Sequence, residues 1–210
     1  MGAEEMRLTR RERERLQHKR EILDVALRLF SERGYYSVSM EEIAKEAEFS
    51  VGTLYNFFKS KEELYKSLVK EVADRFHSSL TKAIEKRGSV IERLRNYLRI
   101  KGDIFRENLP VIRFYFTETR GVSLSVIAGL ELELREQYNS FLERLSHLFE
   151  YGMEEGIFKR IADPFYLAVA LDSISNSFLF LWLQDPDAYP YPEPELVLNI
   201  FFKGLLRSES

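Results

Sequence analysis

The chain has 210 residues, of which 45% are hydrophobic and 31% charged, and its formal net charge is −3. This composition is typical of a folded chain with a packed core and excludes a largely disordered protein. The absence of Cys excludes disulfides, thiolate metal sites and a cysteine nucleophile. Because the net charge is small, nucleic-acid binding would depend on a local patch. Residues 1–20 contain no apolar signal segment, so we expect a soluble cytoplasmic protein.

Helical periodicity runs through the whole chain. Apolar residues repeat at three- and four-residue spacing from Ile22 to Phe30, and Gly34 is predicted to end this helix in a left-handed conformation. Ser residues followed three positions later by Glu predict capping boxes at Ser39, Ser60 and Ser89, and Ser50 is predicted to cap a short helix. The helices expected in the first half span about 21–33, 39–47, 50–58, 60–86 and 89–107.

The second half continues the same pattern. We expect a segment over 110–121, a long helix over 124–155, a helix that begins after Asp163 and ends at 185, and a last helix over 195–206. The stretch 164–183 is apolar enough to raise a transmembrane alternative, but it contains Asp172 and several Ser, so we expect it to pack against other helices. The fold class is therefore all-α, with about nine helices.

The last two predicted helices are apolar on more than one side. Leu196, Ile200 and their neighbours leave the final helix little polar surface, which one copy of the chain could hardly cover. We therefore expect a homodimer in which two copies pair these helices as a four-helix bundle. The small residues Ala168, Ser175 and Asn176 are expected to allow close approach of the partner.

Residues 21–58 have the layout of a helix-turn-helix, with a turn at residues 48–50. The second helix of such a motif places its amino-terminal residues on base edges in the major groove. Those are Val51, Gly52, Thr53 and Tyr55, while Leu54 and Phe58 have the spacing of core residues. Lys59 and Lys61 follow and are expected to pair with phosphates. The basic residues of the amino-terminal arm leave two alternatives open: contact with DNA, or a frayed helical start held by charge pairs.

The string ALRLFSERGYYSVSMEEIAKEAEFSVGTLYNFFKSKEELY, residues 26–65, resembles the DNA-binding domain of the TetR family of transcriptional regulators. The resemblance implies a DNA-binding domain over 1–65 and a ligand-binding and dimerisation domain over 66–210. The DNA-contacting residues that it implies are Ser39 and Lys61 on phosphate, Ser50, Val51, Gly52 and Thr53 on bases, and Tyr55, Asn56 and Phe57 on the backbone or groove rim. Glu48 stands where similar sequences usually have Gly, so we expect strain if it is left-handed. The phrase EYGMEEGIFKRIADP, residues 150–164, is also common in the family.

Residues 97–151 are rich in aromatic side chains, which indicate either a packed core or an apolar ligand site. The family resemblance favours a ligand site, because its members enclose an effector among the middle helices. We therefore expect a lipophilic effector, either a fatty acyl compound or a drug-like aromatic molecule. The predicted lining residues are Phe105, Phe114, Tyr115, Glu118, Tyr138, Phe141, Tyr151, Phe178 and Trp182. No metal and no cofactor is expected, because the three His residues are scattered.

The sequence contains no phosphate-binding Gly-rich loop, HExxH or GxSxG motif, so we do not expect an enzyme. The hypothesis is a homodimeric repressor that a lipophilic effector releases from a pseudo-palindromic DNA operator. A transcriptional activator is one alternative. A soluble lipid- or drug-binding protein with a vestigial DNA-binding head is another. No membrane partner is expected.

Overall fold

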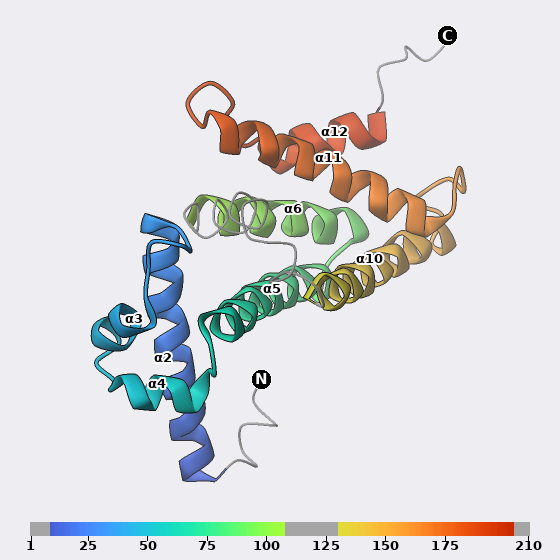
Figure 1. The fold of residues 1–210 in the computed structure, drawn as a ribbon. Helices are drawn as coiled ribbons and strands as arrows, with labels where there is room; N and C mark the ends of the chain where they lie inside the picture. Colours follow the sequence, from blue (N-terminus) through green and yellow to red (C-terminus); the bar gives the residue numbers. More distant parts are fainter. Residues whose placement is uncertain (1–8, 108–129, 204–210) are drawn as a thin grey trace. The chain divides into compact units, whose positions relative to one another are not determined.

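The computed structural model describes residues 9–107 and 130–203, and within them all regular secondary structure is α-helical (Figure 1). The helices are α2 (Arg10–Arg33), α3 (Met40–Glu46), α4 (Val51–Phe57), α5 (Lys61–Glu85), α6 (Val90–Glu107), α10 (Leu130–Glu154), α11 (Pro164–Gln184) and α12 (Pro194–Lys203). The predicted all-α class is confirmed. The expected segment 110–121, the start of the helix expected from 124, and residues 204–206 lie outside the described residues.

Most of the helix starts follow from short side-chain motifs in the sequence. Ser39 and Ser89 each close the predicted capping box: the Ser39 amide donates to Glu42 at 2.8 Å, and the Glu42 amide donates to the Ser39 hydroxyl at 3.2 Å. At Ser60 the box is modified. The Glu63 amide donates to the Ser60 hydroxyl, but the Glu63 carboxylate accepts from the backbone of Lys59. Asp163 caps α11 as expected, accepting from the Phe165 amide at 2.8 Å.

Two glycines end helices with a backbone that other residues rarely adopt. Gly34 follows α2 at φ 80° and ψ 154°, so it is not in the left-handed helical region that the sequence predicted, but in a region open essentially to Gly alone. Gly156 follows α10 at φ 70°, and the amides of Ile157 and Phe158 both donate to the carbonyl of Gly152. A Cβ added at Gly152 would lie only 2.5 Å from the nearest carbon of the Phe158 ring, so the lack of a side chain at Gly152 leaves room for that ring.

The chain divides into two compact units after Val72, within α5. The expected functional boundary at residue 65, between DNA binding and ligand binding, stays a prediction. The described part of the first unit (residues 9–72) holds α2, α3, α4 and the start of α5. Its core contains the buried residues Ile22, Leu23, Ala26, Leu29, Phe30, Ile43, Ala44, Leu54, Phe58, Leu64, Tyr65 and Val69. This is the three-helix core expected for a helix-turn-helix, with the first turns of α5 added.

The described part of the second unit (residues 73–107 and 131–203) holds the rest of α5 and helices α6, α10, α11 and α12. Its core is a single apolar cluster that includes Leu80, Ile84, Leu94, Leu98, Phe141, Leu145, Phe149, Ala168, Leu171 and Val197. The Tyr191 ring packs onto α6 where Gly102 leaves room for it, and its hydroxyl bonds to that of Ser175 at 2.7 Å.

Among the described helices, α11 alone is long and apolar enough to cross a membrane by length and composition, and one third of its most apolar window is buried. Its buried side includes Ala168, Asp172 and Ser175, while Tyr166, Phe180 and Leu181 are exposed. The sequence expectation that small residues face a partner was therefore wrong for Ala168 and Ser175. Both face the interior of the unit. Asn176 is half-buried and donates to Asp172, and its expected place at a partner contact stays a prediction.

Candidate nucleic-acid interface and effector site

The turn between α3 and α4 is held by the carboxyl-terminal end of α3. The Glu48 amide donates to the carbonyl of Lys45 and the Phe49 amide to that of Ala44, which is the bond pattern of a Schellman motif. This motif requires a left-handed residue at the position of Glu48. Glu48 has φ 60°, as the sequence predicted, and it is the sole described non-glycine residue at positive φ. The sharp turn to α4 therefore requires a strained backbone conformation at Glu48, which carries a side chain.

Helix α4 presents one face to the core and one to solvent. Ser50 caps it by accepting from the Thr53 amide at 3.0 Å, and the two hydroxyl groups lie 2.8 Å apart. Leu54 and Phe58 are buried, as their spacing predicted. The opposite face is exposed and consists of Val51, Gly52, Tyr55 and Asn56, with Thr53 half-buried beside them. This face is what a recognition helix needs in order to enter a major groove.

The other expected DNA contacts have different surroundings. Ser39 is half-buried with its hydroxyl used to cap α3, and Phe57 is half-buried beside Phe58. Lys59 is exposed. The Lys61 ammonium lies 4.3 Å from the ring centre of Tyr35, and partial burial lowers the pKa of Lys61 despite the nearby carboxylates of Glu62 and Glu42. In the absence of DNA, the Lys61 ammonium therefore already contacts an aromatic ring.

The interior of the second unit contains a polar cluster that the sequence did not predict. The Asp172 carboxylate on α11 accepts from the Lys101 ammonium and the Tyr97 hydroxyl of α6 on Oδ1, both at 2.5 Å. Its Oδ2 accepts from the Tyr138 hydroxyl of α10 at 2.6 Å and from the Asn176 amide at 2.7 Å. Three helices are therefore joined at one carboxylate, and all four bonds lie within the unit.

Lys101 and Asp172 are almost fully buried, with 2% and 3% of their side chains exposed. Burial opposes ionisation of the carboxylate, but the Lys101 ammonium and the hydroxyl donors outweigh it and hold the pKa of Asp172 below its ordinary value. Burial next to that carboxylate raises the pKa of Tyr97 and of Tyr138, so both hydroxyl groups remain donors. Asp172 could be identified from the sequence as an ionisable residue within an apolar helix. Its partner, 71 positions away, could not be identified in this way.

The predicted ligand residues separate into three groups. Phe105, Phe141 and Trp182 are buried and Phe178 is half-buried against the core, so these four lie in the interior of the second unit. Tyr138 is half-buried and bonded to Asp172. Tyr151 is 46% exposed and lies away from that interior, because it follows Phe141 by ten residues and so projects from another side of α10. Phe114, Tyr115 and Glu118 lie outside the described residues.

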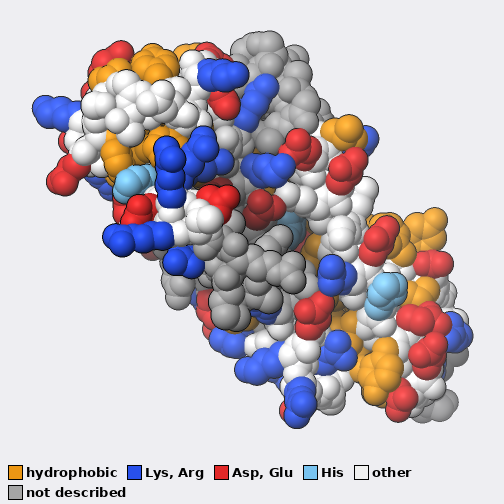
Figure 2. Space-filling view, turned by 90° about the horizontal axis from the view of Figure 1, so that it is seen from below, with side chains coloured by type: hydrophobic (Ala, Val, Ile, Leu, Met, Phe, Trp, Pro, Cys, Tyr) orange, Lys and Arg blue, Asp and Glu red, His pale blue; other side chains and the backbone are white. Residues whose placement is uncertain are grey.

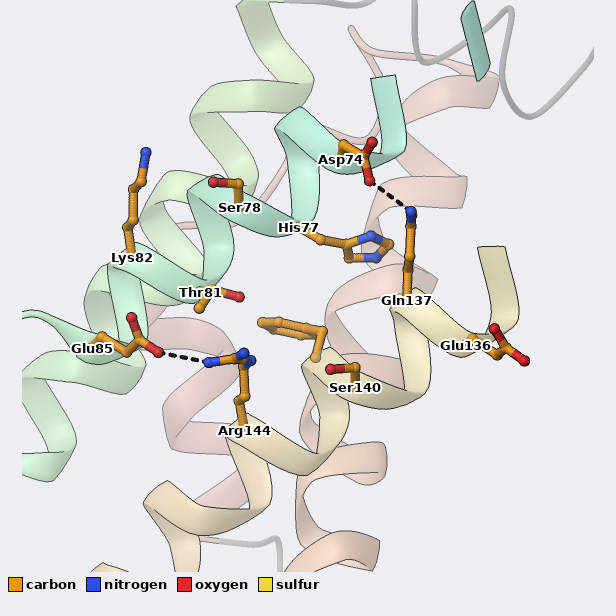
Figure 3. A pocket seen from close by; sticks show the side chains of 11 residues that line it. Asp74, His77, Ser78, Thr81, Lys82, Glu85, Glu136, Gln137, Ser140 and Arg144 are labelled. Atoms are coloured by element: carbon orange, nitrogen blue, oxygen red, sulfur yellow. Dashed lines mark hydrogen bonds and ion pairs between the residues drawn. The ribbon is translucent and has the colours of Figure 1, made fainter. Parts of the chain in front are cut away.

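An open groove of about 570 Å³ runs between α5 and α10 in the second unit (Figure 3). Figure 3 shows Thr81, Lys82, Glu85 and Arg144 toward one end and Asp74, His77 and Gln137 toward the other, with an ion pair of 3.0 Å between Arg144 and Glu85. The remaining lining residues are Ser78, Glu136, Ser140 and Phe141. The groove is thus amphipathic, with charged rims and an aromatic wall.

His77 is the titratable group set most deeply in this groove. Its ring stacks on Phe141 at 6.1 Å, and its Nδ1 is a buried atom without a hydrogen-bond partner among the described residues. Burial lowers the pKa of His77 more than the carboxylates of Asp172 and Asp74 raise it. His77 at the wall of the groove is therefore shifted toward its neutral form, and its Nδ1 is enclosed by the protein. Among the described residues, no group of His, Asp and Glu is arranged to hold a metal ion.

Comparison with known proteins agrees with this architecture. The model of the family described as "Bacterial regulatory proteins, tetR family" matches residues 22–68. The HTH-type transcriptional regulator RutR of Escherichia coli O157:H7 is 30% identical over 152 residues, which cover 71% of this chain and 68% of RutR. The Fatty acid metabolism regulator protein of Bacillus subtilis (strain 168) is 30% identical over 143 residues, covering 65% of this chain and just under two thirds, 66%, of that protein.

Solved structures show the same fold. The regulator FadR from Bacillus subtilis, in complex with stearoyl-CoA, matches with a TM-score of 0.73 at 22% identity, covering 89% of this chain and 98% of FadR. The TetR family regulator PfmR from Thermus thermophilus matches with a TM-score of 0.63 at 26% identity, covering 89% of this chain and 99% of PfmR.

A helix-turn-helix domain followed by a second unit that is helical throughout its described residues is the architecture of a class of DNA-binding transcriptional regulators. The chain belongs to the tetR family of bacterial regulatory proteins.

Proposed function

We propose that the chain is a cytoplasmic, homodimeric transcriptional repressor that binds a pseudo-palindromic operator. The observation that carries the proposal is the two-sided character of α4. Leu54 and Phe58 anchor the helix in the core, while Val51, Gly52, Tyr55 and Asn56 remain exposed. Two such helices in a dimer would enter successive major grooves, about 34 Å apart.

The dimer part of the proposal is supported by apolar side chains on the last two helices. Phe180 and Leu181 on α11, and Leu196, Ile200 and Phe202 on α12, are each between 38% and 49% exposed. Large apolar side chains gathered on two consecutive helices mark an interaction surface. A second copy presenting the same surface would bury them symmetrically.

The effector in this proposal is an amphipathic acyl compound rather than a flat aromatic drug. The relatives named above include a fatty acid metabolism regulator and a FadR structure that holds stearoyl-CoA. In this chain, the interior aromatic residues Phe105, Phe141 and Phe178 offer apolar surroundings for a chain. The groove beside Phe141, with Lys82 and Arg144 at its rim, supports a polar head group. Effector binding would release the operator by favouring a conformation that binds DNA poorly.

The test starts from a duplex selected by the purified protein out of a random pool. The Kd for that duplex is measured with and without acyl-CoAs of increasing chain length, and separately with flat aromatic cations. Affinity for an acyl chain should rise by about 0.8 kcal/mol per buried methylene until the site is full. Trp182, the one Trp in the chain, lies buried in α11 and reports binding in the second unit through its emission.

Two outcomes would contradict the effector proposal. If no acyl compound weakens duplex binding while a polar metabolite or a metal ion does, the aromatic residues form only a core. If acyl compounds change the emission of Trp182 but leave the Kd for DNA unchanged, they bind without acting as effectors. A transcription assay on the selected sequence distinguishes repression from activation.

A further inference from the structure

The inner face of α2 changes its chemistry along the helix. Ile22, Ala26 and Leu29 lie on this face and are buried in the core of the first unit. The same face continues toward the amino terminus at four-residue spacing through Lys19, Arg15 and Arg11. The helix therefore extends past the core, and the face that is apolar within the core becomes cationic beyond it.

Two of these cations lie against the aromatic side chains at the end of the recognition helix. The guanidinium carbon of Arg15 is 5.8 Å from the ring centre of Phe57, and the ammonium of Lys19 is 5.7 Å from that of Phe58. Phe57 is the last residue of α4, and Phe58 is its carboxyl-terminal cap. Cation–π contacts of this kind keep the charges beside α4 without neutralising them.

The acidic residues nearby are engaged elsewhere. Glu12 accepts from the amide and hydroxyl of Thr9, and Glu14 accepts from Arg10 at 2.8 Å. No described carboxylate lies within ion-pairing distance of Arg11, Arg15 or Lys19. Figure 2, seen from the side toward which the amino-terminal end of α2 points, shows several Lys and Arg side chains there, with Asp and Glu side chains between them. An anionic partner would therefore meet three cations that are not held in ion pairs with described residues.

We infer that Arg11, Arg15 and Lys19 form a phosphate-binding ridge along α2 that contacts the DNA backbone beside the groove entered by α4. The inference rests on the proposed DNA-binding function and adds contacts that the helix-turn-helix does not supply. DNA is the partner, because two of the cations are fixed to the helix that reads the groove, and phosphates border that groove. The guanidinium groups of Arg11 and Arg15 match phosphate oxygens in a bidentate manner.

The test compares the salt dependence of duplex binding. In the Arg11→Gln/Arg15→Gln variant, the Kd should rise for the selected and for an unrelated duplex alike, by roughly 30-fold at about 0.15 M salt. The slope of log K against log salt should become shallower by about two units. The matched control is Arg95→Gln/Arg99→Gln, which removes the same charge from α6 in the second unit and should leave the slope unchanged. Arg11→Lys/Arg15→Lys keeps the charges and should keep most of the slope.

The outcomes separate this inference from the function on which it rests. If the wild-type chain binds no duplex at any salt concentration, the proposed function fails. If the wild type binds and Arg11→Gln/Arg15→Gln retains both affinity and slope, the ridge is wrong. A loss confined to the selected duplex, with the slope unchanged, would indicate base contacts and also overturn it. Arg11→Gln alone touches no aromatic ring, so its expected change of about one slope unit cannot come from altered packing of Phe57.

Discussion

The ammonium of Lys101 and the carboxylate of Asp172 lie 2.5 Å apart in the interior of the second unit and join α6 to α11. Both groups have lost nearly all contact with water, so each depends on the other for stabilisation. The pair also orients the Tyr97 and Tyr138 hydroxyl groups, which complete the hydrogen bonding of the carboxylate.

Replacing Lys101 by Met should lower the free energy of unfolding by about 3–5 kcal/mol, because it leaves a buried carboxylate without its counter-charge. The double variant Lys101→Met/Asp172→Leu should be more stable than Lys101→Met alone, since it removes that charge as well. Urea denaturation of the three proteins measures both effects. Arg144→Met is the control: it breaks an exposed pair with Glu85 and should cost at most about 1 kcal/mol. Equal losses in Lys101→Met and Arg144→Met would show that the buried pair contributes nothing special.

His77 should make stability depend on pH below its ordinary pKa of about 6.5. Burial lowers the pKa of His77 in the folded chain, so the unfolded chain binds the proton more readily. This contribution is fully present above pH 6.5 and is lost as the pH falls toward the lowered folded value, with a slope of at most about 1.4 kcal/mol per pH unit. His77→Leu should flatten that part of the stability profile. The exposed His147, changed to Gln, serves as the control, and an identical flattening in both variants would refute the assignment.

Replacing Glu48 by Gly should raise the free energy of unfolding by about 1 kcal/mol. The φ of 60° at Glu48 is strained for a residue with a Cβ, and Gly would remove that strain. The energy gained by removing it outweighs the greater conformational freedom of Gly in the unfolded chain. Glu48→Ala retains the Cβ and should give no such gain. Thermal or urea unfolding compares the two. A gain in Glu48→Ala equal to that in Glu48→Gly would instead point to the Glu side chain as the source of the strain.

Tyr55→Ala should weaken binding to the selected duplex by about 1–3 kcal/mol with little change in stability, because Tyr55 lies on the exposed face of α4. Thr53→Ala should have an effect in the same range. Leu54→Ala, one position away but buried, should instead cost about 2–5 kcal/mol of folding free energy. Binding is measured at one fixed salt concentration. Unchanged affinity in both Tyr55→Ala and Thr53→Ala would contradict the orientation assigned to α4.

Local features of the fold were predictable from the sequence, because they depend on residues a few positions apart. The capping boxes at Ser39 and Ser89, the cap at Ser50 and the positive φ of Glu48 are all of this kind. The recognition helix was predictable for the same reason, since its buried and exposed faces follow from helical spacing.

The polar cluster around Asp172 was not predictable, because it depends on which helices become neighbours. Lys101 follows Arg99 and precedes Asp103 in a charged stretch of α6 that would ordinarily be solvated. Only packing against α11 turns Lys101 inward and makes Asp172 its partner. The placement of Tyr151 also depends on packing: it was grouped with the other aromatic residues by composition, but it is exposed on a different face of α10.

The structure of the turn after α10 explains two residues of the segment EYGMEEGIFKR, namely Gly152 and Gly156. Gly152 supplies space for the Phe158 ring, and Gly156 supplies a backbone conformation; a Cβ at Gly156 would meet no atom within 4 Å. The two glycines therefore constrain evolution differently. At position 152 a side chain would collide with the Phe158 ring, whereas at position 156 there is space for a side chain but the positive φ favours Gly or Asn. The segment therefore specifies the geometry of a helix corner: a side chain at position 152 must displace the Phe158 ring, and one at position 156 must adopt a strained backbone conformation.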